Sequence, residues 1–242
     1  MMVKLDALMM DENELKKEAD TAEDVSIINC LGQRYLGCAR KKGHMLLSGT
    51  PGNGLASYLD GARIDVDGNV QDAVADTMNS GLVTIHGSAG DALCYAMRGG
   101  RVFVSGNAGY RAGVHMKAYK DKQSLLIIGG TAGSFLGEYL AGGTIIVLGL
   151  NKGDDSPLTG YFCGNGMYAG TIYIRSRVKP VNLSDTLTWS VMSEMEKQEE
   201  LVPLLSDYVK IFSLSLDAVL AGTFARIRAD SSKISKQLYA AV

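Results

Sequence analysis

The sequence predicts a mainly β protein whose central part is a parallel β-helix of about seven coils. Three observations support this prediction: glycines that recur every nineteen residues, apolar residues that alternate between them, and a composition that changes after Arg177. A fixed period near twenty residues indicates a solenoid of stacked repeats. A unit this short has no room for a strand plus a packed helix, but it fits one coil of short strands and tight corners.

The repeat is clearest in the glycine that begins each unit. The step between these glycines is nineteen residues, except for one step that is longer by five and predicts an insertion around Ala118–Gln123. The glycine pairs at 99–100 and 142–143 fit corners that need a positive φ. The lead glycines are Gly49, Gly68, Gly87, Gly106, Gly130 and Gly149.

Apolar residues hold equivalent places in successive units, so we expect them to stack inward as ladders. Alternation at period two marks the strand positions, and we expect adjacent coils to pair at about 4.8 Å. The first strand position is occupied in successive units by Ile64, Val83, Val102 and Ile145. The position two residues later is occupied by Val66, Ile85, Val104 and Val147. Ten residues after the lead glycines stand Leu59, Met78, Met97, Met116 and Leu140. A ladder of small residues collects Ala56, Ala75, Cys94, Gly113 and Gly137.

Three segments follow from this pattern: an N-terminal helical lead or cap over residues 1–25, the β-helix over 26–178, and a C-terminal helical extension over 179–242. Within the lead, Asp11–Asp20 is expected to form a helix with Asp11 as its N-cap. A strand over Val25–Cys30 is expected to enter the first coil.

Glycine nearly disappears from the C-terminal extension, and helical spacing begins there. Apolar residues at i, i+3, i+4, i+7, i+8 and i+11 predict a helix over Leu201–Phe212, with Pro203 in its first turn or ending an earlier helix at Met192–Glu200. A short helix is expected over Asp217–Gly222, and a weakly patterned arm from Thr223 onward. The open ends of a β-helix need covering. Two roles stay open for the C-terminal helices, which could cap the β-helix or dock on another subunit.

Composition narrows the classes of function. The chain has 242 residues and a net charge of −2, without a basic block that would favour nucleic acid. No apolar run reaches the length of a membrane span, and the charged start does not resemble a secretory signal. The four cysteines lack a CxxC spacing, which favours reduced thiols and a cytoplasmic location.

Asp72 and Asp91 are the only catalytic candidates that the pattern offers. They hold the same position in adjacent coils, so their carboxyl groups would lie about 5 Å apart, the separation in retaining glycosidases. The favoured interpretation is that both are turn residues, because aspartate often bonds to nearby backbone groups in turns. The glycine loops recur in every unit, so corner geometry accounts for them better than nucleotide binding. The three histidines, His44, His86 and His115, fall at different repeat positions and show no metal-ligand spacing.

Five stretches resemble the GXGXG domain, the C-terminal right-handed β-helix of the glutamate synthase large subunit. The likeness is greatest to stand-alone "domain 3" proteins of that family, and it extends to the third subunit of formylmethanofuran dehydrogenase. The stretches are Asn29–Gly37, Gly49–Gly54, Gly68–Asp72, Gly109–Lys117 and Gly130–Leu150. Non-glycine residues replace the family's usual glycine at Ala56, Ala73, Ala75, Cys94 and Ala96.

The resemblance implies a single-stranded right-handed β-helix that serves as a non-catalytic assembly subunit of a glutamate-synthase-like oxidoreductase or amidotransferase complex in nitrogen metabolism. It implies that this chain binds no cofactor or metal, and that FMN and iron–sulfur clusters belong to synthase-like partner chains beside a glutaminase-like subunit. The alternatives are a formylmethanofuran-dehydrogenase-type subunit, a free-standing enzyme acting on polysaccharide, and a structural homo-oligomer. No nucleic acid or membrane is expected as a partner.

Overall fold

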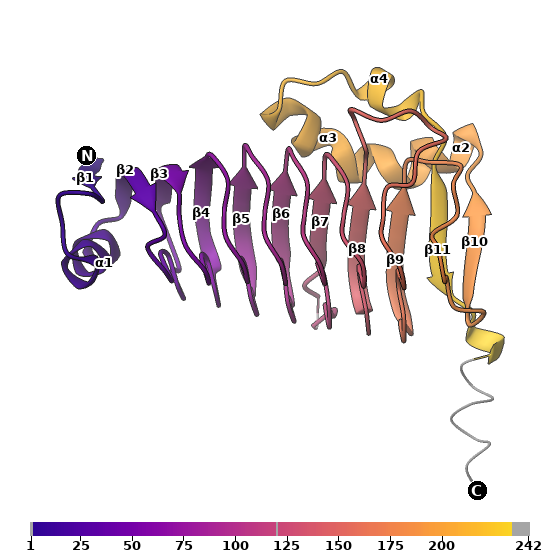
Figure 1. Cartoon of the computed structure of the whole chain (residues 1–242), viewed down its shortest axis with the longest axis horizontal. Helices are drawn as coiled ribbons and strands as arrows, with labels where there is room; N and C mark the ends of the chain where they lie inside the picture. The colour runs from indigo at the N-terminus through magenta and orange to yellow at the C-terminus, as the bar shows by residue number, and fades with distance from the viewer. Residues whose placement is uncertain (1, 120, 234–242) are drawn as a thin grey trace, which may run out of the picture.

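Successive strands of this chain stack side by side along one axis and build a rod (Figure 1). The computed structural model describes residues 2–119 and 121–233. The protein is mainly β, and its body is a parallel β-solenoid of about seven turns, as the nineteen-residue period predicts. Nine strands, β1 to β9, lie in chain order in one sheet, which ends in the order β9-β11-β10. The first nine pair in parallel, whereas β11 runs antiparallel to both of its neighbours.

The strands of the rod are short. They are β1 (Val3–Asp6), β2 (Asp24–Leu31), β3 (His44–Thr50), β4 (Asp60–Asp67), β5 (Ser80–Ile85), β6 (Gly100–Val104), β7 (Ser124–Ile128), β8 (Ala141–Val147) and β9 (Ala169–Ile174). The closing strands are β10 (Leu187–Val191) and β11 (Ala225–Ala229).

The core is a set of inward ladders in strict register. Ile64 pairs with Val83, Val83 with Val102, and the column continues through Leu126 and Ile145. These side chains are fully buried, as are Met78, Met97 and Met116 of the opposite ladder. Each such burial contributes on the order of 1.5–3 kcal/mol. The inward strand and methionine positions expected from the repeat are confirmed.

The wall opposite the sheet is built from residues in the left-handed conformation. Ala56, Ala75 and Cys94 have φ of 58°, 57° and 59°, and Gly113 and Gly137 continue the column at 70° and 63°. Their backbone N–H groups reach the preceding coil, for example Ala75 N to Leu55 O at 2.8 Å and Cys94 N to Val74 O at 2.8 Å. The small residues therefore mark a second hydrogen-bonded wall rather than a simple turn.

The lead glycines form a column along a corner of the rod. A Cβ on Gly68 would lie 2.1 Å from the carbonyl oxygen of Gly49, and one on Gly87 would lie 2.5 Å from that of Gly68. The backbone N–H of Gly106 donates to Gly87 O at 2.9 Å, and Gly130 donates to Gly106 at 2.8 Å. The stacked backbones leave no space for a side chain at these positions. The close approach of neighbouring coils therefore explains why glycine recurs every nineteen residues.

The predicted insertion lies where the period lengthens. Tyr119 and Lys122 form a small antiparallel bridge, and the ammonium of Lys122 lies 3.4 Å from Asp60 Oδ1 of an earlier coil. The loop thus folds back over the corner of the rod, which keeps the strands on either side in register. Residue 120 lies outside the described residues.

The N-terminal end is closed by α1 (Glu12–Thr21), whose Leu15 and Ala19 are buried in the main core. As predicted, Asp11 is the N-cap, and its carboxylate accepts the backbone N–H of Asn13 at 2.9 Å. Arg40 of the first coil donates to the carbonyls of Ala19, Ala22 and Glu23. This guanidinium satisfies carbonyls at the helix end and attaches the cap to the rod.

The C-terminal helices lie along the side of the rod (Figure 1). They cover the outer face of β6 to β9, where Phe103, Ile127 and Ile146 pack against Leu205 and Tyr208 in a second core. The prediction left these helices either as caps or as docking elements on another subunit; they pack on this chain's own sheet. They are α2 (Glu194–Glu196), the π-helical turn η1 (Lys197–Leu201), α3 (Val202–Ile211) and α4 (Leu216–Leu220).

Two strands close the C-terminal end. Ile227 of β11 pairs with Ile172 of β9 and with Trp189 of β10, so the sheet continues past the last coil. The prediction of an arm from Thr223 onward is therefore wrong over Ala225–Ala229, which form a strand. The C-terminal extension is thus not helical throughout. Its alternation of apolar and basic residues, ARIRA, is a strand signal that the polar composition obscured. The last part of that predicted arm, 234–242, lies outside the described residues.

Candidate interaction surfaces

Asp72 and Asp91 lie one above the other on a corner of the rod. One carboxylate oxygen of Asp72 accepts the backbone N–H of Asp91 at 2.8 Å, and Asp91 Oδ1 accepts that of Tyr110 at 2.8 Å. Asn53 makes the equivalent bond in the preceding coil, since its side-chain oxygen accepts the N–H of Asp72 at 3.1 Å. Each side chain links its coil to the next, which is a structural task for one oxygen of each carboxylate.

The cysteines are dispersed along the rod. Cys30, Cys94 and Cys163 are buried and Cys38 is exposed. Burial raises the pKa of Cys30 to about 11 and that of Cys163 to about 12, so these two thiols stay protonated at neutral pH. Among the described residues, no group of three or more His, Cys, Asp or Glu side chains could hold a metal ion.

The three histidines lie at separate places. His44 Nε2 lies 2.5 Å from Asp65 Oδ2 on the outer face of the sheet, and Arg63 Nε donates to the same oxygen at 2.7 Å. Burial opposes ionisation of Asp65, but the hydrogen bonds from Arg63 and His44 outweigh it and lower the pKa of this carboxyl. The ring of His86 packs edge-on against Phe212, the residue that follows α3, with 5.1 Å between centroids.

The outer face of the sheet is covered only in part. Beside Asp65 lies a hollow of about 260 Å³, lined among others by Ser48, Asp67 and His86. The second core covers β6 to β9 but includes no buried residue of β1 to β5. A strip of sheet near the N-terminal end therefore faces outward beside the helical layer.

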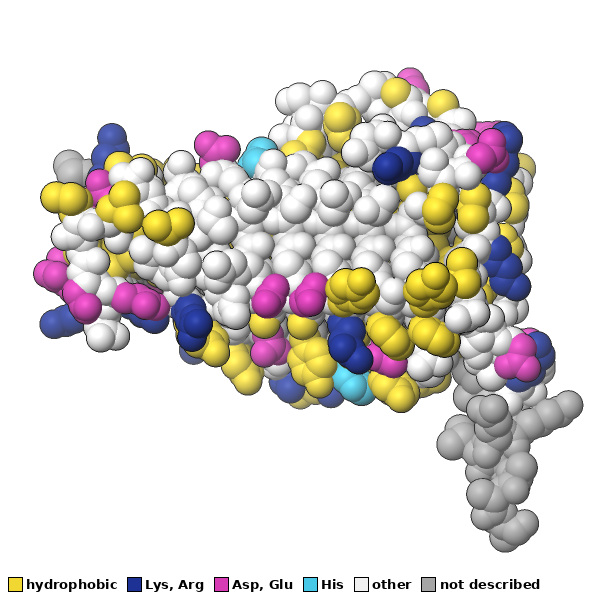
Figure 2. All heavy atoms as spheres, in the orientation of Figure 1, with side chains coloured by type: hydrophobic (Ala, Val, Ile, Leu, Met, Phe, Trp, Pro, Cys, Tyr) yellow, Lys and Arg dark blue, Asp and Glu magenta, His cyan; other side chains and the backbone are white. Residues whose placement is uncertain are grey.

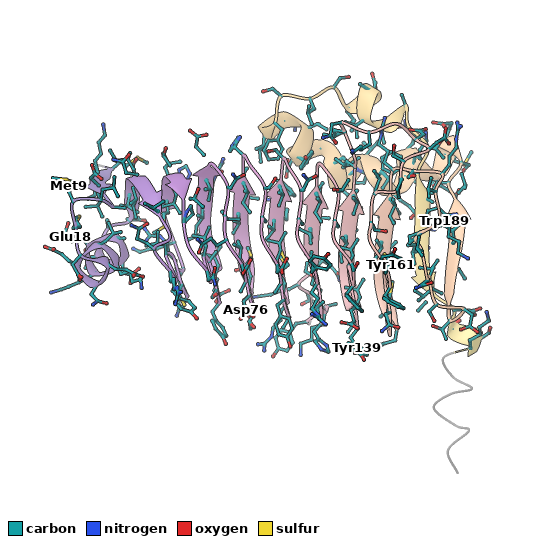
Figure 3. The ribbon with its side chains drawn as sticks, in the orientation of Figure 1. Met9, Glu18, Asp76, Tyr139, Tyr161 and Trp189 are labelled. Carbon is teal, nitrogen blue, oxygen red and sulfur yellow. The ribbon has the colours of Figure 1, made fainter. Side chains whose placement is uncertain are left out.

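The N-terminal end carries a concentration of exposed apolar side chains. Met9, which precedes the capping helix α1, is 82% exposed, and Leu31, the last residue of β2, is 73% exposed. In the side-chain view Met9 projects at the extreme end of the molecule (Figure 3), and apolar groups gather there on the visible surface (Figure 2). We call this set the apolar end: Val3, Leu8, Met9, Ile28 and Leu31.

A row of aromatic rings follows the corner opposite the sheet. His115 stacks on Tyr139 with centroids 5.1 Å apart and planes 11° apart, and Tyr95 meets His115 edge-on at 5.7 Å. Asp76 and Tyr139 mark this edge of the rod in Figure 3. The row and the apolar end were both missed from the sequence. The signal was present in the tyrosines of the repeat, which recur at outward positions of units that are otherwise small and apolar.

The fold and the glycine column together define a class, a GXGXG-type β-helix. The chain belongs to the GXGXG motif family, whose model matches residues 16–236. The chain is also similar to "Uncharacterized protein MJ1350" of Methanocaldococcus jannaschii. The two are 46% identical over 209 residues, which cover 85% of this chain and 80% of that relative.

Membrane insertion through a helix has no support in the described part of the chain. None of its helices is long and apolar enough to span a bilayer.

Proposed function

We propose that this chain is a non-catalytic assembly subunit of a glutamate-synthase-like oxidoreductase complex. In this proposal the partners are a glutaminase-like chain and a synthase-like chain, and FMN and iron–sulfur clusters are bound by the latter. Family membership supports this class of complex, because the chain resembles the GXGXG β-helix at the C-terminus of the glutamate synthase large subunit.

The apolar end is the observation that carries the proposal. The core of the rod is closed by its own elements at both ends, so the exposed Met9 and Leu31 contribute nothing to its packing. Exposed apolar patches rimmed by polar groups mark protein interaction sites. A rigid rod that presents such a patch at one end is suited to hold another chain at a fixed position.

Tagged protein recovered under native conditions tests this function. We expect a glutaminase-like chain and a coloured chain with flavin and cluster absorption to co-elute, identified by mass spectrometry and by the visible spectrum. A colourless eluate without these partners would contradict the proposal. Elution as a self-associated species would instead favour the homo-oligomer.

Met9→Asp tests the surface itself. A charge in a buried apolar contact costs several kcal/mol, so we expect recovery of the partner chains to fall at least about tenfold. Met195→Asp is the matched control, because Met195 is 71% exposed and lies in α2, away from the apolar end. Equal recovery with both variants would exclude the apolar end as the docking surface.

A further inference from the structure

An open groove of about 490 Å³ lies on the aromatic corner, in a region of the molecule that the assembly role does not use. Tyr95, His115, Tyr139 and Tyr168 line it, together with two cations, Arg98 and Lys117. Its volume falls within the range of about 300–1,000 Å³ that is typical of small-molecule sites.

The two cations occupy equivalent places in adjacent coils. The backbone N–H of Arg98 donates to Met78 O at 2.8 Å, and that of Lys117 donates to Met97 O at 3.0 Å, one coil further on. Coils repeat at about 4.8 Å, and like charges directly opposite each other on neighbouring strands are destabilising. We therefore expect the two positive charges to repel each other in the unliganded protein.

The two cations differ from others of the corner in lacking an ion-pair partner. Other cations of the corner are paired: Lys122 with Asp60, and Arg111 with Glu138. Neither Arg98 nor Lys117 forms an ion pair with a residue that the structure describes. Arg98 is partly exposed to solvent, although its Nε is buried without a hydrogen-bond partner.

The aromatic rings supply the other half of a recognition surface. Tyr139 is 46% exposed and Tyr168 59%, so ring surface next to the cations faces solvent. Ring faces bind planar groups by offset stacking, whereas arginine and lysine bind carboxylate or phosphate oxygens.

We propose that the groove binds a small organic anion in which a carboxylate or phosphate group is joined to a planar ring. The acidic group lies between the side chains of Arg98 and Lys117. The planar ring packs against the exposed tyrosines. The anion neutralises the stacked cations, so its binding stabilises the rod. This site is independent of the apolar end and of the assembly role.

Calorimetric titration of the purified chain tests the proposal. The probes are adenosine monophosphate, which carries a phosphate, and indole-3-acetate, which carries a carboxylate. Adenosine and inorganic phosphate are titrated alone as the separate fragments. We expect one or both joined probes to bind more tightly than either fragment, and the one that binds identifies the acidic group. Binding of neither joined probe would overturn the proposal.

Three variants locate the site. Lys117→Gln and Tyr139→Asn are expected to weaken binding at least about tenfold, as when a charge-assisted hydrogen bond or a stacked ring is lost. Asparagine tolerates the left-handed backbone at position 139, where φ is 54°. Lys152→Gln, at an exposed lysine outside the groove, is expected to leave affinity unchanged. Equal affinity in all three variants would place the ligand elsewhere.

The stacked cations also predict a ligand-free effect. Lys117→Gln removes the repulsion, so the melting temperature should rise by about 1–3 °C at low salt, and the gain should shrink at high salt. Lys152→Gln should show no such gain. A lower melting temperature for Lys117→Gln would contradict the unpaired repulsion on which the site rests.

Discussion

At the residue scale, small and large side chains are matched across the core in several coils. A Cβ on Gly37, Gly113 or Gly137 would lie 2.5, 2.5 or 2.8 Å from the Cδ1 of Ile64, Ile145 or Ile172 respectively. Alanine replaces glycine in this column at Ala56 and Ala75, whose equivalent strand partners in the next coil are Val83 and Val102. Valine lacks Cδ1, and this makes room for the extra methyl group.

Gly113→Ala tests this relation. The substitution places an L side chain at φ +70° and against Ile145 Cδ1, so we expect it to lower the free energy of unfolding by about 2–4 kcal/mol. In an Ile145→Val background the same substitution should cost at least about 1 kcal/mol less, because the clashing atom is gone. Urea unfolding of the four proteins measures this coupling, and an equal cost in both backgrounds would show that only the backbone conformation matters.

The buried thiols predict how stability depends on pH. Burial raises the pKa of Cys163 to about 12, whereas an unfolded thiol titrates near pH 8.5. The folded protein therefore keeps a proton that the unfolded chain loses. Stability from this group is complete below about pH 8.5 and is lost as the pH rises from there towards 12.

Cys163→Ala should lessen this alkaline loss. Between pH 9 and 10.5 we expect the stability of the variant to fall less steeply than that of the wild type, by up to about 1.4 kcal/mol per pH unit. Unfolding by urea at several pH values measures both slopes. Cys38→Ala, at an exposed thiol whose pKa is also raised by partial burial, should show a smaller change, and parallel wild-type and Cys163→Ala curves would exclude the buried thiol as the source.

At the element scale, α3 is held on the sheet by a buried tyrosine. The hydroxyl of Tyr208 donates to Val104 O of β6 at 3.1 Å, and its ring meets Phe103 edge-on at 5.7 Å. A Cβ on Gly129 would lie 2.4 Å from that hydroxyl, so the glycine after β7 provides the space. Burial raises the pKa of Tyr208, which keeps its hydroxyl a donor.

Tyr208→Phe should destabilise the helical layer with little change in shape. The Val104 carbonyl would lose one of its two donors and keep the backbone N–H of Gly129 at 2.8 Å, so we expect a cost of about 0.5–1.5 kcal/mol and a melting temperature lower by about 1–6 °C. Calorimetry measures the shift. Amide exchange should show faster opening of 202–211 than of the strand ladders, and unchanged protection of that helix would mean that the bond does not secure it.

At the scale of the whole molecule, the repeat made most of the rod predictable from the sequence. Period and alternation identified the inward ladders because a coil buries the same positions in every turn. The covering elements were less predictable, since Ala225–Ala229 forms a strand only because β9 offers it an edge. The left-handed wall was also not predicted, because alanine and cysteine, unlike glycine, do not indicate a positive φ at positions such as Ala56 and Cys94.

The surfaces were harder to predict than the core. Arg98 and Lys117 stand nineteen residues apart and look like ordinary solvated side chains until the coils bring them together. For Asp72 and Asp91 the same spacing allowed a pair of catalytic carboxylates, although turn residues were the favoured interpretation, and each has an oxygen bonded to the next coil's backbone. Exposed residues carry no periodic constraint from packing, so their partners become visible only in three dimensions.

The nineteen-residue coil also has a consequence for the length of the molecule. Every coil presents the same backbone pattern on its two sides, so removing or adding one whole coil would leave the two terminal structures intact and change their separation by about 4.8 Å. The distance between whatever is attached at the two ends can thus change only in discrete steps. Related chains could differ in the length of the rod by whole coils, without any change in their terminal structures.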